Sequence, residues 1–288
     1  MGTHMKFEEV YREGPLYLAK AIFGMPRKGC SGTDVSDAVE EYLAALLKNG
    51  QIGDEYLWAD KGHPVVAYVS VPAVAALDAK HTSSWGIQAL REIVRIFGKP
   101  PKIEMQERPK KADLSSWRSA NLLYLYTHLF DSGSPIRVGG FDYSIPLYLL
   151  PLKETQREYL VRWARSYRNH DAMWIDSGSL EMQAYKQLAD PNSDLSKEGR
   201  EHCVEIEAIT RKPTYYYLIR FYGRRQGEDG RRCPLCGRRW AIRNTLGQTR
   251  RFDHFAFKCD RCRLVSNRAC DNNDNKRLAR IGEYNRSK

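Results

Sequence analysis

The sequence of 288 residues predicts an α+β fold, and three observations lead to this prediction. Strand-like and helix-like segments alternate through roughly the first 110 residues. Apolar residues then recur at helical spacing as far as residue 210. The last quarter holds two Cys-x-x-Cys pairs set among arginines, which is typical of a small metal-stabilised module. We therefore expect three parts, residues 5–110, 111–212 and 213–288, and residues 1–4 resemble a vector remnant.

The first part is predicted to be a ferredoxin-like unit, with the order strand, helix, hairpin, helix, strand. Both helices carry apolar residues at three- and four-residue spacing and are followed by glycine, and Thr33 or Asp34 is a suitable N-cap for the first. The turn-forming stretch Asp60–Pro64 joins the hairpin. The elements are expected at Leu16–Phe23, 33–50, Glu55–Trp58, Val65–Val71, Trp85–Phe97 and Lys102–Glu107.

The middle part is predicted to combine a β segment with helices. Leu122–Phe130 and Ile136–Leu150 are strand-like and are joined by a Ser-Gly-Ser turn. Three helices follow: one carries Tyr159, Leu160, Trp163 and Tyr167, one covers Leu180–Ala189, and one begins at Ser196. After Pro213, the aromatic-rich run Thr214–Tyr222 predicts a strand that leads into the third part.

The two cysteine pairs predict a metal site. Cys233 and Cys236 are followed, after 22 residues, by Cys259 and Cys262. Four thiolates at this spacing can surround one Zn²⁺ tetrahedrally, and they leave no open position for water, so the zinc is expected to be structural. The intervening residues would form a hairpin that carries the second pair to the first. Iron on the same four thiolates and two separate redox pairs remain as alternatives.

The positive charge is concentrated around these cysteines. Residues 211–288 carry 21 Lys and Arg against 7 Asp and Glu, a net charge of +14. Residues 1–210 carry 25 against 28, a net charge of −3, and the whole chain has a charge of +11. A basic module attached to a mildly acidic body indicates a polyanionic partner.

The composition of this basic region favours nucleic acid, with RNA or single-stranded DNA preferred. The arginine fork matches phosphate oxygens in two-point contacts, and flat aromatic side chains stack on bases. An alternative for Trp240 is a place inside the ribbon, where its loss would release zinc. The residues predicted to contact nucleic acid are Arg231, Arg232, Arg238, Arg239, Trp240, Arg243, Arg250, Arg251, Lys258, Arg261 and Arg263.

The chain resembles a known family at these motifs. CPLCGRRW (233–240), FDHFAFKCDRCRLVSN (252–267) and PTYYYLIRFYGRR (213–225) are similar to bacterial zinc-ribbon proteins of unknown function that are described as candidates for nucleic-acid binding. The resemblance also covers the hairpin near Gln51–Val71 and residues 191–218. It implies the same four zinc ligands and supplies no reaction.

The sequence as a whole predicts a non-enzymatic protein that binds nucleic acid. Residues 1–210 contain no phosphate-binding glycine loop and no Gly-x-Ser-x-Gly elbow. One alternative is an adaptor whose ribbon docks on a larger machine, with residues 5–210 as a protein-partner site. A second alternative is a nuclease that uses Glu104 with Glu107 or Asp113.

The expected location is the cytoplasm, away from any membrane. The longest apolar runs are far below the ~18 residues that a membrane-spanning helix needs. No charged stretch followed by an apolar stretch opens the chain, so no secretory signal is expected. Thiols stay reduced in the cytoplasm, which suits metal binding by the cysteines.

Overall fold

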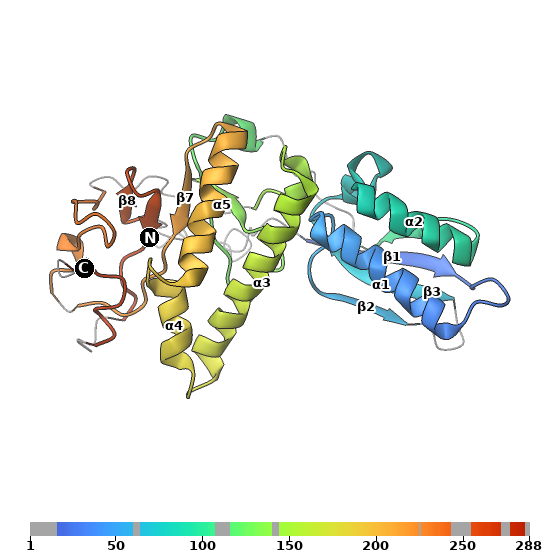
Figure 1. Cartoon of the computed structure of the whole chain (residues 1–288), viewed down its shortest axis with the longest axis horizontal. Helices are drawn as coiled ribbons and strands as arrows, with labels where there is room; N and C mark the ends of the chain where they lie inside the picture. The colour runs from blue at the N-terminus through green and yellow to red at the C-terminus, as the bar shows by residue number, and fades with distance from the viewer. Residues whose placement is uncertain are drawn as a thin grey trace, which may run out of the picture.

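The computed structural model describes residues 16–59, 64–106, 116–139, 144–224, 226–242, 255–271 and 277–285. The molecule is elongated, as Figure 1 shows. The unit formed by residues 16–59 and 64–106 lies at one end, a layer of long helices lies in the middle, and the segment with the paired cysteines lies at the other end.

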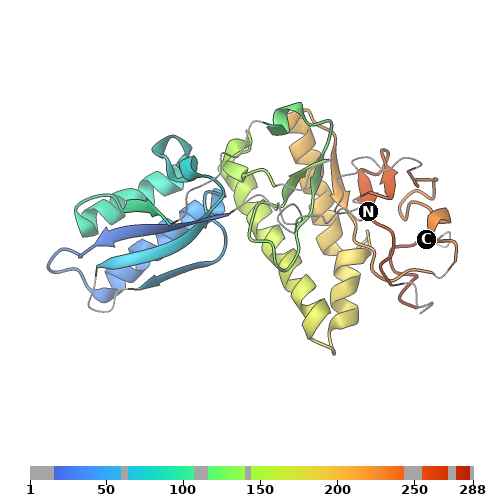
Figure 2. The same cartoon turned by 180° about the vertical axis from the view of Figure 1, so that it is seen from behind.

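The N-terminal unit has the predicted ferredoxin-like topology. Its strands lie in the order β2-β3-β1-β4, and all neighbours are antiparallel. Figure 2 shows the sheet in front of the two helices, which therefore cover only one of its faces. The elements are β1 (Tyr17–Gly24), α1 (Gly32–Lys48), β2 (Tyr56–Ala59), β3 (Val65–Val71), α2 (Ser84–Phe97) and β4 (Lys102–Met105).

Local signals explain the ends of the two helices. Ser31, rather than Thr33 or Asp34, is the N-cap of α1, and Asp34 closes a capping box by accepting from the Ser31 backbone at 2.9 Å. Ser31 takes this position because its hydroxyl can accept from the Asp34 amide three residues later. Gly98 ends α2 in the left-handed conformation at φ 81°, as the sequence predicts.

The middle part contains the three predicted helices and shorter strands than expected. The 3-10 turn Leu147–Leu149 stands where the sequence predicts the end of a strand, because Pro146 has no N–H to donate to a sheet. The third helix begins earlier than predicted, with Ser193 as its cap. The elements are β5 (Leu123–Leu125), β6 (Ile136–Val138), α3 (Glu154–Asp176), α4 (Glu181–Ala189), α5 (Asp194–Thr210) and β7 (Thr214–Tyr217).

A second sheet joins the middle part to the cysteine-bearing part. Its order is β6-β5-β7-β9-β8, where β8 (Phe257–Cys259) and β9 (Leu264–Ser266) form a hairpin that includes the second cysteine pair. β7 pairs in parallel with both β5 and β9. One apolar core also runs across both parts, and Trp163 of α3 belongs to it together with Trp240. Residues 111–212 and 213–288, predicted as separate parts, therefore share a sheet and a core.

Polar contacts connect α3 to the N-terminal unit. The Arg168 guanidinium pairs with the Asp54 carboxylate, and both side chains are largely buried. The backbone N–H of Ser84 donates to the Glu154 carboxylate at 2.6 Å near the start of α2. Along the described ranges, every helix is too short or too polar to cross a membrane.

Candidate metal centre

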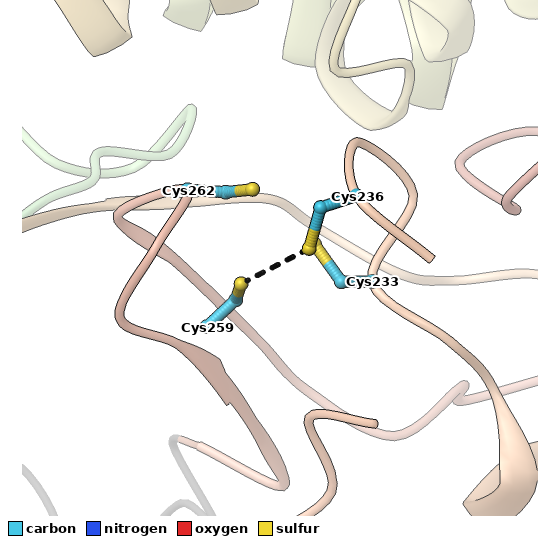
Figure 3. A group of neighbouring side chains, drawn as sticks. All are labelled: Cys233, Cys236, Cys259 and Cys262. Carbon is cyan, nitrogen blue, oxygen red and sulfur yellow. Dashed lines mark hydrogen bonds between the residues drawn. The ribbon is translucent and has the colours of Figure 1, made fainter. Parts of the chain in front are cut away.

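Two tight turns bring the four predicted cysteines together, and Figure 3 shows their sulfurs converging on one point. The sulfurs of Cys233, Cys236, Cys259 and Cys262 all lie within 4.8 Å of one another, and the Sγ atoms of Cys236 and Cys259 are 3.6 Å apart. A disulfide needs about 2.0 Å between its sulfurs. A tetrahedral zinc with Zn–S distances near 2.3 Å places its sulfurs about 3.8 Å apart. The four thiols therefore form a group that can hold a metal ion.

Each cysteine pair lies in a turn that ends in a residue with positive φ. Gly237 follows Cys236 with a φ of 68°, and Arg263 follows Cys262 with a φ of 49°. In the first turn, the Gly237 amide donates to the Cys233 carbonyl at 2.9 Å. Glycine suits position 237 for a second reason, because a Cβ there would lie 2.7 Å from the Tyr284 ring.

Burial opposes the thiolate form at three of the four cysteines. Burial raises the pKa of Cys233 to about 12 and also raises the pKa of Cys262. Burial opposes ionisation of Cys236 as well, but the Arg238 amide and the neighbouring thiols outweigh it and lower the pKa of Cys236 to about 7. A metal ion bound by the sulfurs would stabilise the thiolate forms that burial opposes.

Four of the predicted contact arginines lie exposed on the two turns that carry the cysteine pairs (residues 232–239 and 259–263). Arg232, Arg238 and Arg239 surround the first cysteine pair, and Arg261 lies inside the second. Among the described residues, none of these four forms an ion pair with a carboxylate. The Arg232 side chain donates instead to the Gly237 carbonyl at 3.1 Å, which fixes it against the first turn.

Two other predicted contact residues are half-buried and paired. Lys258 lies 2.8 Å from the Asp260 carboxylate, and Arg263 lies 2.5 Å from that of Glu207 on α5. Their charges are thus largely compensated within the protein. The predicted residues Arg243, Arg250 and Arg251 lie outside the described residues.

Arg231 and Trp240 lie in the interior rather than on the predicted contact surface. Arg231 is 7% exposed and Trp240 is 3% exposed. The Arg231 guanidinium lies 4.7 Å from the Trp240 ring centre and 4.4 Å from that of Phe257, and it donates to the Ser266 hydroxyl at 2.9 Å. Burial and the nearby charge of Arg220 lower the pKa of Arg231 to about 9. Trp240 packs in one core with Cys233 and Cys259, and Arg231 packs on the Trp240 ring, so both residues support the cysteine-bearing turns from inside.

Trp240→Ala is therefore expected to release the metal rather than simply weaken a contact with bases. Removing a buried Trp side chain costs about 3–5 kcal/mol of stability. A chromogenic chelator should extract metal from this variant at lower concentration than from the unchanged protein. Tyr159→Ala, which removes a 48% exposed ring on α3, is the control and should retain metal. Full metal retention by the Trp240 variant would contradict the interior role.

Arg220 is a buried residue that organises the region and that no sequence motif identifies. Arg220 is 1% exposed and donates to the carbonyls of Ala279 and Ile281 at 2.9 and 2.8 Å. Its guanidinium also bonds the Glu228 carboxylate at 3.1 Å. These contacts hold residues 277–285 against the ribbon, where Tyr284 packs on the first turn. The one signal in the sequence was an arginine within the apolar run that follows Pro213.

The fold and the site define the class as an α+β protein with a ribbon-like four-cysteine unit. The models of two domains of unknown function match it, DUF2310 over residues 118–219 and DUF8594 over residues 223–272. Two uncharacterised proteins of Haemophilus influenzae are each 41% identical to it over 145 residues, which is 50% of this chain. The match covers 69% of one relative and 54% of the other. The chain belongs to this bacterial family of unknown function.

One solved structure was also found to be similar. It is the solution structure of a hypothetical protein of Arabidopsis thaliana, with 12% identity and a TM-score of 0.25. The match covers 39% of this chain and 99% of that chain. A likeness at this score says nothing further about fold or function.

Proposed function

We propose that the four cysteines hold one structural zinc ion and that the protein binds nucleic acid through the exposed arginines of the two metal-binding turns. The observation that carries this proposal is the position of Arg232, Arg238, Arg239 and Arg261, exposed and without a carboxylate partner among the described residues. A guanidinium that no carboxylate neutralises is available for two-point contacts with phosphate oxygens.

The nearby acids support this proposal because they are already paired with other cations. Asp260 accepts from Lys258 and from the Tyr215 hydroxyl, and these hydrogen bonds lower the pKa of Asp260. Glu283 is paired with Arg220 and Arg224. The positive charge on the turns is therefore not neutralised by these acids.

The donor set supports zinc as the metal. Four cysteine thiolates in a closed tetrahedral arrangement are a common structural zinc site. The zinc would fix the two turns, and the turns would fix the backbone that carries the arginines. Elemental analysis should find one zinc per chain, and iron in its place would refute this part of the proposal.

The affinity for a single-stranded oligonucleotide is expected to fall steeply with salt. Each neutralised phosphate on a single strand contributes about −0.7 to the slope of log affinity against log salt, so about four to seven contacts give a slope near −3 to −5. Fluorescence anisotropy of labelled RNA and DNA strands at several salt concentrations measures this slope. A flat profile would show that the charge does not meet phosphate and would favour an adaptor that docks on protein.

A further inference from the structure

Residues 277–285 are held against the ribbon by buried contacts. Arg220 donates to two backbone carbonyls of this segment at 2.9 and 2.8 Å, and its guanidinium also lies 3.3 Å from the Glu283 carboxylate. Gly282 lies so close to the end of α4 that a Cβ there would be 2.5 Å from the Ala189 carbonyl oxygen. The side chain that follows Glu283 is therefore presented in a defined place.

That side chain is Tyr284, an exposed aromatic residue beside the first cysteine-bearing turn. It is 38% exposed, and the hydroxyl end of its ring lies over Gly237, where a Cβ would be 2.7 Å from the ring atoms Cε1 and Cζ. The other aromatic side chains that the structure describes after residue 226 are buried: Trp240, Phe255 and Phe257. Among these described residues, the stacking role that the sequence predicted for Trp240 is thus open to Tyr284.

Positive charge lies next to the Tyr284 ring. The Arg232 guanidinium donates to the Gly237 carbonyl at 3.1 Å, so this guanidinium and the ring contact the same residue of the turn. Arg238, which is exposed, comes next in the chain. The acid that precedes the ring, Glu283, is already paired with two arginines. The ring is therefore bordered by guanidinium groups that its neighbouring acid does not neutralise.

We propose that Tyr284 stacks on a base of a single-stranded nucleic acid whose phosphates are held by the arginines of the two turns. This inference rests on the proposed function and adds a contact to the bases, which the arginines alone do not supply. An aromatic side chain can stack on any base, but the base must be unpaired and free of its own neighbours. The ligand would therefore be a single strand, bound with little preference for sequence.

The test compares a single-stranded DNA with an abasic strand of the same length, which keeps the phosphates and lacks the bases. In fluorescence anisotropy, the zinc-loaded full chain should bind the strand with bases more tightly. Tyr284→Ala should weaken binding of this strand about tenfold or more and leave binding of the abasic strand unchanged. The salt slope should stay the same, because stacking releases no counterions.

Three controls separate stacking from support of the turn. Tyr284→Phe keeps the ring and should restore the affinity for the strand with bases. Tyr159→Ala removes a 48% exposed ring on α3 and should bind both strands as the unchanged protein does. A chelator should extract metal no more easily from Tyr284→Ala than from the unchanged protein, because Tyr284 lies outside the buried core that includes Cys233 and Cys259.

Two results would overturn the inference and leave the proposed function in place. One is an equal weakening of both strands by Tyr284→Ala, which would show that the ring supports the turn rather than contacts bases. The other is full affinity of this variant for the strand with bases. A salt-independent affinity of the unchanged protein would instead overturn the proposed function, and this inference with it.

Discussion

Cys259→Ser is expected to abolish metal retention and to unfold a larger part of the chain than the ribbon. Zinc binding in small four-ligand modules is worth about 10–16 kcal/mol, and this energy also folds the module. Cys259 ends β8, and β8 with β9 forms one edge of the five-stranded sheet. The apolar core that packs against this sheet also includes Trp163 of α3. Unfolding should therefore extend into the middle part. The N-terminal unit has a core of its own and should stay folded.

Hydrogen exchange followed by mass spectrometry measures how far the unfolding extends. Amides of β7 and α5 should lose protection in Cys259→Ser, whereas those of β1 and β3 should keep it. Cys270→Ser is the control, because Cys270 is exposed and lies outside the group of four. Loss of protection confined to residues 226–271 would show that the ribbon unfolds independently of the sheet that it shares.

Arg238→Ala combined with Arg239→Ala is expected to weaken oligonucleotide binding strongly without loss of metal. Each lost phosphate contact should make the salt slope less negative by about 0.7, so the double variant should change it by about 1.4. Adding Arg232→Ala and Arg261→Ala should bring the total change to about 2.8. The first turn uses backbone atoms of Arg238, so its side chain can be removed while the turn is retained.

The double variant Arg162→Ala and Arg165→Ala is the matched control. Both arginines are exposed on α3, so the same total charge is removed far from the cysteines. This control should leave the salt slope unchanged. An equal reduction in both double variants would mean that only the overall charge matters, and it would contradict a specific role of the cysteine-bearing turns.

Local patterns explain why much of the fold was predicted correctly. The N-terminal unit depends on amphipathic helices, glycine stops and a short hairpin, all of which are visible over a few residues. The cysteine group could also be predicted from the sequence. The spacing of Cys233, Cys236, Cys259 and Cys262 indicates which side chains lie together in the folded chain.

The features that the sequence did not predict depend on strand pairing between distant segments and on buried charged side chains. No local pattern indicates that β7 pairs in parallel with β5 and β9, because these strands are distant in the chain. The burial of Arg220 and Arg231 could not be predicted from the sequence either, because arginine is ordinarily exposed. Their burial depends on partners as remote as Ser266 and Ala279, which only the folded chain brings near.

Strand β7 is kept from being an edge of the shared sheet by the cysteine-bearing hairpin next to it. In the folded chain, β7 is covered on both sides by β5 and β9, and all four of its residues are buried. Without the ribbon, one side of Thr214–Tyr217 would become an open edge with unpaired backbone groups and three adjacent tyrosines. Such an edge is a template for another chain. If the cysteines hold the proposed metal, loss of that metal would then convert the protein into an aggregating species, and its solubility would depend on the metal supply.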